Sequence, residues 1–274
     1  MRTKKIGFIG GGNMASSLIN GLITSGHAAA QLWVSDVNSQ TLQNFTQLNV
    51  NVCSDNRAVI EAVEVVVLAV KPQILQSVAE EIAESVQQKS TLVVSIAAGI
   101  TQQSLSRWLG EQVAIVRCMP NTPALVLTGA TALYANANVN EEQRNLAENI
   151  LRAVGISLWV EQESVLDIVT AVSGSGPAYY FLLMEAMEIA AIQMGLSTEM
   201  ARLLIQQTAL GAAKIALEST ESPQQLRHRV TSPNGTTQKA IEMFEQGHFT
   251  ELVANALLAA QQRSIEMSKE LSGI

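Results

Sequence analysis

Short apolar runs rich in β-branched residues alternate with longer amphipathic stretches over about the first 160 residues of the chain. Such alternation is typical of βαβ units, in which a helix connects successive strands of a parallel sheet. Together these runs predict a doubly wound α/β sheet of eight short strands. The predicted strands are 5–9, 32–35, 50–53, 65–70, 92–96, 114–118, 131–134 and 157–160.

The amphipathic stretches between these strands predict the connecting helices. The last of them has a capping-box start, because Asn140 is followed three residues later by Gln143. The predicted helices are 13–25, 39–48, 56–62, 74–86, 102–109 and 141–153.

The strand pattern ends near Glu161, and the rest of the chain is predicted to be all helical. We therefore expect two domains, an α/β domain at 1–161 and a helical domain at 162–274. The helix at 177–194 is apolar on more than one side, which requires burial within a domain or a dimer. A helical dimer interface is expected, and a large monomeric core is the alternative. The predicted helices of this region are 177–194, 198–218, 223–229, 238–245 and 249–272.

Composition narrows the classes of partner. The 274 residues include 17 Lys and Arg against 24 Asp and Glu, and a net charge of −7 lacks the basic surface that nucleic acids require. The most apolar long stretch, 178–196, contains Glu185 and Glu188, so no membrane-spanning helix is expected. Neither a nucleic acid nor a membrane is therefore an expected partner.

The start of the chain and the cysteines favour the cytoplasm. The basic residues within 1–5 are followed by a glycine-rich run rather than an apolar segment, so no export signal is expected. Cys53 and Cys118 are too few for a disulfide framework and lack C-x-x-C spacing. The three histidines stand far apart in the sequence, so no metal site is expected.

A glycine-rich turn follows the first predicted strand and opens the first predicted helix. Gly10, Gly12 and Ala15 fit the G-x-G-x-x-A fingerprint of dinucleotide-binding sheets. The first glycine permits the tight turn, and the second lets the backbone approach a pyrophosphate that faces the helix N-terminus. We expect Gly10, Gly12, Asn13 and Met14 to bind NAD(P). A purely structural role is the alternative, because glycine-rich turns also occur where the fold alone requires them.

Asp36 ends the second predicted strand, about 20 residues after the glycine-rich turn. A carboxylate at this place can accept hydrogen bonds from the adenosine ribose, which favours NADH over NADPH. A role as a simple cap at the end of the strand is the alternative. A 2′-phosphate would instead need donors, and these could come from Ser35, Asn38, Ser39 and Asn56.

Further segments end strands at the edge where open α/β sheets bind ligands. Small residues at 69–72 and 95–99 would let a nicotinamide ribose lie against the backbone, whereas Lys71 could serve the cofactor or face solvent. The two prolines in 119–123 predict an ordered loop. This loop is either a wall of the site or a structural turn.

Two loops of the helical region concentrate hydroxyl groups and backbone N–H groups just before helices. They are SGSGPAY at 173–179 and TSPNGTT at 231–237. A helix N-terminus of this kind can hold a small carboxylate without an arginine. Ordinary capping loops are the alternative.

Six segments, in order and spanning almost the whole chain, resemble pyrroline-5-carboxylate reductase, the family that reduces a cyclic imine to proline. The segments are GFIGGGNMA, AVKPQIL, VVSIAAGIT, RCMPNTPALV, AVSGSGPAYYF and VTSPNGTTQKAIE. The resemblance implies a Rossmann domain followed by a helical dimerisation domain. It also implies an active site at the dimer interface, where the nicotinamide of one subunit meets a substrate loop, and higher assemblies that are often rings of five dimers.

The resemblance also implies roles for individual residues. Thr237 would lie near the ring nitrogen as a hydrogen-bond partner or proton donor, and Glu221, in a less clearly matched stretch, would be a substrate neighbour. The substrate carboxylate would be held by Ser232, Gly235, Thr236 and Thr237. The cofactor would be lined by Asn56, Ala69, Val70, Lys71, Pro72, Ala97, Pro120 and Asn121.

Two positions depart from the family's pattern. Asn234 stands where the late loop usually has glycine, and asparagine tolerates a left-handed backbone better than most residues. Asp36 stands where family members often carry a hydroxyl residue and use NADPH. The resemblance therefore implies NADPH, and Asp36 leaves NADH open.

The chemistry fits a site without an essential histidine or lysine. Hydride transfer to a protonated C=N bond depends mainly on orientation and exclusion of water. A β-hydroxyacid dehydrogenase would need a lysine and an asparagine where this chain has Tyr180 and Met184. A protein that only binds NAD(P) would have no use for the loop at 231–237. The sequence thus predicts NAD(P)H-dependent reduction of 1-pyrroline-5-carboxylate to L-proline.

Overall fold

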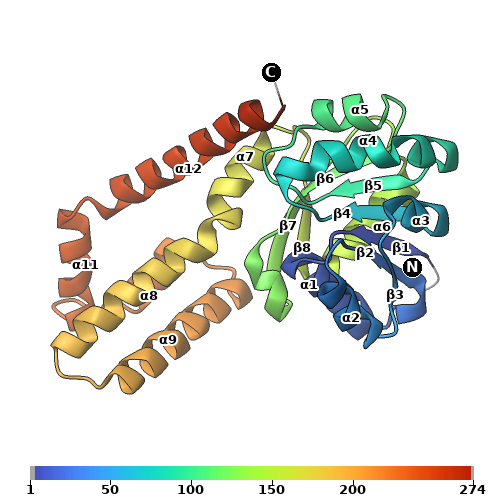
Figure 1. The fold of residues 1–274 in the computed structure, drawn as a ribbon. Helices are drawn as coiled ribbons and strands as arrows, with labels where there is room; N and C mark the ends of the chain where they lie inside the picture. The colour runs from blue at the N-terminus through green and yellow to red at the C-terminus, as the bar shows by residue number, and fades with distance from the viewer. Residues whose placement is uncertain (1–3, 273–274) are drawn as a thin grey trace. The chain divides into compact units, whose positions relative to one another are not determined.

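A computed structural model describes residues 4–272 of the chain and divides them into two compact units (Figure 1). The first unit contains the residues up to Ser175 together with those from Ala260 onward, and the second is Gly176–Ala259. The division thus lies beyond the boundary expected after residue 161, because the helical turns that follow pack on strands of the first unit.

The first unit is built on an eight-stranded sheet with the strand order β3-β2-β1-β4-β5-β6-β7-β8. All eight predicted strands are present. β7 runs antiparallel to β6, because the connection holds only the short 3-10 helix η2 (Thr122–Val126) in place of a crossover helix. The other pairs are parallel. The strands are β1 Ile6–Ile9, β2 Leu32–Ser35, β3 Asn51–Cys53, β4 Val65–Leu68, β5 Leu92–Ser95, β6 Ile115–Met119, β7 Gly129–Ala135 and β8 Gly155–Trp159.

Helices cover both faces of this sheet, and each face has its own apolar core. Leu18 and Ile150 come from helices on one face, and Leu75 and Leu105 come from helices on the other; all four are fully buried. Burial of such side chains contributes about 1.5–3 kcal/mol each. The predicted capping box of Asn140 forms as expected. The first face carries α1 Asn13–Thr24, α2 Ser39–Thr46 and α6 Glu141–Arg152, and the second carries α3 Asn56–Ala62, α4 Pro72–Lys89 and α5 Gln102–Leu109.

After β8 the chain is helical, as predicted, and it begins with a segment that the pattern did not predict. This segment is α7 (Val165–Val169), followed by a π-helical turn at Thr170–Gly174, and it belongs to the first unit. The last helix, α12, begins in the second unit and ends in the first. The remaining helices are α8 Gly176–Gln193, α9 Thr198–Glu218, α10 Pro223–Arg229, α11 Thr236–Gln246 and α12 Phe249–Ser272.

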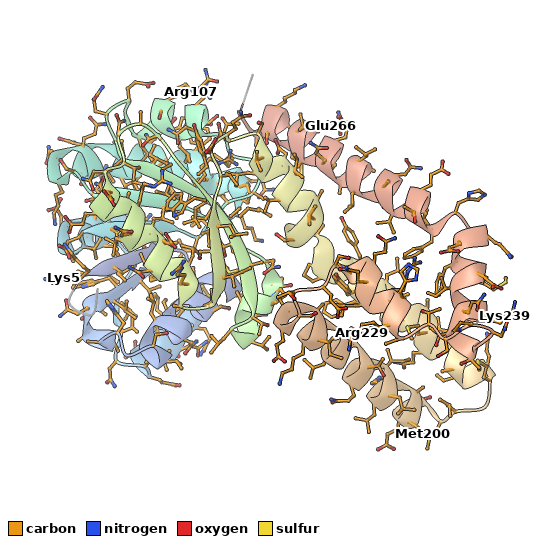
Figure 2. The ribbon with its side chains drawn as sticks, turned by 180° about the vertical axis from the view of Figure 1, so that it is seen from behind. Lys5, Arg107, Met200, Arg229, Lys239 and Glu266 are labelled. Atoms are coloured by element: carbon orange, nitrogen blue, oxygen red, sulfur yellow. The ribbon has the colours of Figure 1, made fainter. Side chains whose placement is uncertain are left out.

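The second unit exposes apolar side chains on several helices. Tyr180, Phe181 and Leu182 are about two-thirds exposed, and Met200, labelled in Figure 2, is half exposed. Soluble monomers rarely expose contiguous apolar surface on this scale. These exposed side chains therefore indicate a surface on which another protein chain can pack.

Candidate active site

The glycine-rich turn joins β1 to α1, and its two fingerprint glycines differ in whether the fold itself requires glycine. Gly10 has a φ of +95°, and a Cβ there would lie 2.7 Å from the carbonyl oxygen of Ala69, so the fold itself requires glycine. Gly12 has an ordinary φ of −67°, and a Cβ there would meet no protein atom within 4 Å. Gly12 is exposed and no side chain caps α1, so the first N–H groups of the helix are open to an anion.

The next two residues begin α1. Asn13 is exposed and Met14 is half-buried against the core of the first unit. Ala15 is buried, which allows the helix to pack closely on the sheet.

Asp36 lies beside this turn at the carboxyl end of β2. The backbone N–H of Gly11 donates to Oδ2 at 2.7 Å, and the N–H of Asn38 donates to Oδ1 at 2.8 Å. The carboxylate is half-buried and fixes the glycine-rich turn against the strand. It therefore places a negative charge at the position where a dinucleotide fold recognises the ribose.

The residues expected to serve a 2′-phosphate are largely engaged within the protein. Ser35 is fully buried and donates to Oδ1 of Asn56 at 2.7 Å, and Asn56 donates to Glu81 at 3.0 Å. The side chain of Asn38 caps α2. Ser39 is exposed at the start of that helix.

The other cofactor candidates lie at the same edge of the sheet, because β4, β5 and β6 run parallel to β1. Ala69 and Val70 follow β4 and are half-buried, whereas Lys71 is exposed and precedes Pro72, the first residue of α4. Ala97 follows β5 and is buried. Pro120 and Asn121 follow β6 and are also buried.

The late loop of the second unit ends in an uncapped helix. Gly235 precedes α11, and no side chain caps the helix N-terminus. The N–H of Gly235 donates to the carbonyl of Ser232 at 3.0 Å, which closes the loop. The side chains of Ser232, Thr236 and Thr237 are exposed. The N-terminus of α11 can therefore bind a small anion, and two hydroxyl groups stand beside it.

Asn234 adopts the left-handed conformation expected of it, with a φ of +60°. Its N–H donates to Oε1 of Gln238 at 2.7 Å, so the loop is also fixed to the next turn of the helix. Glu221 is half-buried and forms an ion pair with Arg229, so a substrate contact would have to replace that partner.

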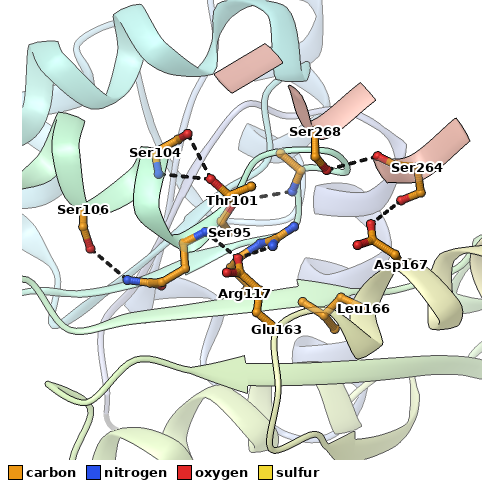
Figure 3. Close-up of polar contacts among 12 residues, drawn as sticks. Ser95, Thr101, Ser104, Ser106, Arg117, Glu163, Leu166, Asp167, Ser264 and Ser268 are labelled. Carbon is orange, nitrogen blue, oxygen red and sulfur yellow. Dashed lines mark hydrogen bonds and ion pairs between the residues drawn. The ribbon is translucent and has the colours of Figure 1, made fainter. Parts of the chain in front are cut away.

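A cluster of polar side chains that sequence reasoning missed includes Arg117 of β6 and residues of the segments that follow β8 (Figure 3). Glu163 accepts from Arg117 on β6 and from the backbone N–H of Gln102. Ser264 of α12 donates to Asp167 of α7 at 2.7 Å. The partners lie far apart in the sequence, so no local pattern indicates them.

Among residues 4–272, no group of three or more His, Cys, Asp or Glu side chains is arranged to hold a metal ion. No helix in the same range is long and apolar enough to cross a membrane. Both cysteines are free, and burial raises the pKa of the Cys118 thiol well above its usual range.

Comparisons with known proteins point to one activity. The family "Pyrroline-5-carboxylate reductase dimerisation" matches residues 163–267, and "NADP oxidoreductase coenzyme F420-dependent" matches residues 5–99. Pyrroline-5-carboxylate reductase of Pseudomonas aeruginosa is 50% identical over 272 residues, 99% of each chain. The enzyme of Escherichia coli is 39% identical over 97% of this chain and 99% of its own.

Solved structures give the same result. A pyrroline-5-carboxylate reductase from Coxiella burnetii has a TM-score of 0.94 and 47% identity, with 97% of this chain and 99% of that chain covered. Plasmodium falciparum pyrroline carboxylate reductase with NADP bound has a TM-score of 0.87 and 32% identity, with 98% and 99% covered.

Proposed function

The chain belongs to the pyrroline-5-carboxylate reductase family, and we propose that its glycine-rich turn holds the pyrophosphate of the cofactor while the start of α11 holds the substrate carboxylate. The protein is an NAD(P)H-dependent oxidoreductase that reduces 1-pyrroline-5-carboxylate to L-proline. The bound nicotinamide supplies the hydride, and the residues of the chain supply position, charge and exclusion of water.

The first unit fits a dinucleotide because of the open space at Gly12. The fold gives no reason for a glycine there, whereas an approaching pyrophosphate does. Gly10, Asn13 and Met14 would complete that wall. Ala69–Pro72, Ala97 and Pro120, at the same edge of the sheet, would hold the nicotinamide half.

Asp36 directs the cofactor preference toward NADH. Its carboxylate is held by two backbone N–H groups and retains lone pairs for a ribose 2′-hydroxyl. A 2′-phosphate would meet this negative charge without help from Ser35, which is buried. We therefore propose that NADH is accepted at least as well as NADPH.

The preference is tested with Asp36→Ser. Like charges about 4 Å apart cost between about 1 and 4 kcal/mol, and partial exposure favours the lower half of that range. The NADPH-to-NADH affinity ratio should therefore rise roughly 5- to 70-fold. Any damage to the turn should weaken the binding of both cofactors alike, so it should not change the ratio of their affinities. Glu64→Gln removes a carboxylate that accepts the N–H of Lys5 at the opposite edge of the sheet, and it should leave the ratio unchanged. An unchanged ratio in Asp36→Ser would exclude the role given to Asp36.

One observation supports the proposed substrate site: the N-terminus of α11 is uncapped and lies beside two threonines. The backbone N–H groups of Thr236 and Thr237 would bind the carboxylate, with Ser232 and Gly235 shaping the loop. The hydroxyl of Thr237 would hold or deliver a proton at the ring nitrogen. A protonated imine is already electrophilic, so a hydroxyl suffices where an alcohol dehydrogenase needs a base.

Thr237→Ala tests this assignment by oxidation of NADH and NADPH with pyrroline-5-carboxylate. Loss of a hydrogen bond to a charged group costs about 1.5–3 kcal/mol, so kcat/KM should fall roughly 10- to 150-fold. Thr250→Ala changes an exposed threonine in the first turn of α12 and should behave as the parent protein. Parent-like turnover and KM in Thr237→Ala would remove Thr237 from the mechanism.

We propose that two copies pair through the helical unit and that five such dimers form the full assembly. The match to a dimerisation family over 163–267 and the exposed apolar faces of α8 and α9 support the pairing. In this arrangement the nicotinamide end of one copy would meet the loop at 231–237 at the interface.

A further inference from the structure

Asn121 has each of its amide atoms bonded within the first unit. Its Nδ2 donates to the carbonyl of Ser173 at 3.1 Å, and its Oδ1 accepts from the backbone N–H of Ala130 at 2.9 Å. The residue is only 9% exposed. The side chain therefore joins the end of β6 to two other segments rather than pointing freely toward a ligand.

The bond to Ser173 replaces one that the sequence removes. In an α-helix the carbonyl of residue 173 would accept from the backbone N–H of residue 177, and residue 177 is proline, which has none. The Nδ2 of Asn121 supplies a donor to this carbonyl. The amide thus compensates for the N–H that Pro177, the second residue of α8, cannot supply.

The carbonyl belongs to the π-helical turn Thr170–Gly174. The N–H of Ser175 closes this turn by donating to Thr170 at 2.8 Å. Gly174 faces the end of the Met119 side chain, whose Cε would lie 2.5 Å from a Cβ at this position. Such turns are rare and occur frequently at functional sites. Both Met119 and Asn121 therefore hold the turn against the end of β6.

We infer that Asn121 is a positioning residue that sets the π-helical turn beside the nicotinamide end of the site. The inference rests on the proposed function, which places that end at Ala97 and Pro120. Asn121 acts through Ser173, and the pyrophosphate wall at Gly10 and Gly12 does not depend on it. Its loss should therefore disturb the alignment for hydride transfer and leave nucleotide binding intact.

Asn121→Ala tests this by separating binding from turnover. A displacement of about 1 Å can cost about 100-fold in rate, so kcat with pyrroline-5-carboxylate should fall roughly 10- to 100-fold. The Kd for NADH, measured by fluorescence titration without substrate, should stay within about twofold of the parent value. The matched control is Asn136→Ala, since Asn136 bridges Ile115 and Val113 at the other end of β6. It removes an equivalent amide and should leave kcat unchanged.

Pro177→Ala provides a rescue that a general packing role would not show. It restores an N–H four residues after Ser173, so the double variant Asn121→Ala, Pro177→Ala should recover a large part of the lost kcat. If Asn121→Ala does not fold, Asn121→Asp keeps an acceptor for Ala130 and replaces the donor to Ser173 with a carboxylate oxygen that faces the carbonyl, so its kcat should fall at least as far.

Three results would overturn the inference. A rise in the NADH Kd that accounts for the lost activity would make Asn121 a cofactor contact. An unchanged kcat, or a double variant with no recovery, would remove the link through Ser173. Failure of the proposed function is distinguishable, because then the parent protein itself would not oxidise NADH or NADPH with this imine.

Discussion

Gly12→Ala and Gly10→Ala should separate what the glycine-rich turn does for folding from what it does for binding. Both glycines belong to the same fingerprint, yet the structure gives them different reasons to be glycine. At Gly12 a methyl group meets no protein atom within 4 Å, and the backbone φ of −67° suits alanine. At Gly10 the φ is +95° and the methyl would lie 2.7 Å from the oxygen of Ala69.

The magnitudes follow from this difference. Gly12→Ala is a surface change without strain, so the free energy of unfolding should change by no more than about 0.5 kcal/mol. Gly10→Ala combines left-handed strain of about 1–2 kcal/mol with a clash against backbone that cannot move freely, for a total loss of about 2–4 kcal/mol. For nucleotide binding, a methyl group at Gly12 occupies the space that a pyrophosphate must enter, and the NADH Kd should rise at least about tenfold.

Urea unfolding followed by tryptophan fluorescence measures stability, and titration with NADH measures the Kd. Asn20→Ala, on an exposed part of the same helix α1, is the control and should change neither quantity by much. If Gly12→Ala bound NADH as tightly as the parent protein, the turn would not be the pyrophosphate site. If Gly12→Ala lost stability as Gly10→Ala does, the open space at Gly12 would have no functional meaning.

Three further predictions concern stability, the late loop and assembly. Burial lowers the pKa of His27, so the unfolded chain takes up a proton first and stability should fall as the pH drops below about 6.5. His27→Gln should flatten that dependence in urea unfolding, and an unchanged pH dependence in this variant would contradict the role of His27. Asn234 has a φ of +60°, which glycine adopts without strain. Asn234→Gly should therefore leave the loop at 231–237 and the KM for the imine unchanged. Asn234→Ala should cost about 1–2 kcal/mol of loop stability and raise that KM. Leu203, on α9, has a side chain that is 66% exposed, and Leu203→Lys should shift the sedimentation coefficient toward that of the monomer. The control Gln76→Lys, at an exposed position on α4, should leave the coefficient unchanged. An unchanged coefficient in Leu203→Lys would mean that the partner copy packs on another surface.

Sequence reasoning succeeded where the determining forces are local. The apolar runs gave all eight strands, and the capping box at Asn140 formed as predicted, because neighbouring residues decide both. The reversed direction of β7 is not visible in such runs, since it depends on the length and path of the connection from β6. The π-helical turn at Thr170–Gly174 was missed because the carbonyl of Ser173 accepts from Asn121, a residue distant in the sequence.

In the candidate site, too, features set by neighbouring residues could be predicted, whereas contacts between distant residues could not. The fingerprint predicted a tight turn at Gly10, where the structure has a φ of +95°, and Asn234 adopted the left-handed conformation expected of it. The bond between Asn121 and Ser173 joins residues 52 positions apart, and the bond between Ser264 and Asp167 joins residues 97 apart. Contacts of this kind depend on the folded sheet, and residue types alone cannot pair them.

Cofactor choice shows why a list of suitable donors is not a binding site. The sequence offered Ser35 and Asn56 as donors for a 2′-phosphate, and their residue types are right for it. The hydroxyl of Ser35, however, points inward from a central strand and donates to Asn56, which in turn donates to Glu81. Asp36, the next residue, lies just past the end of β2 and accepts from the backbone N–H groups of Gly11 and Asn38. The end of this strand thus buries the candidate phosphate donor and leaves a half-buried carboxylate at the turn, and that carboxylate is the physical reason to expect NADH to bind.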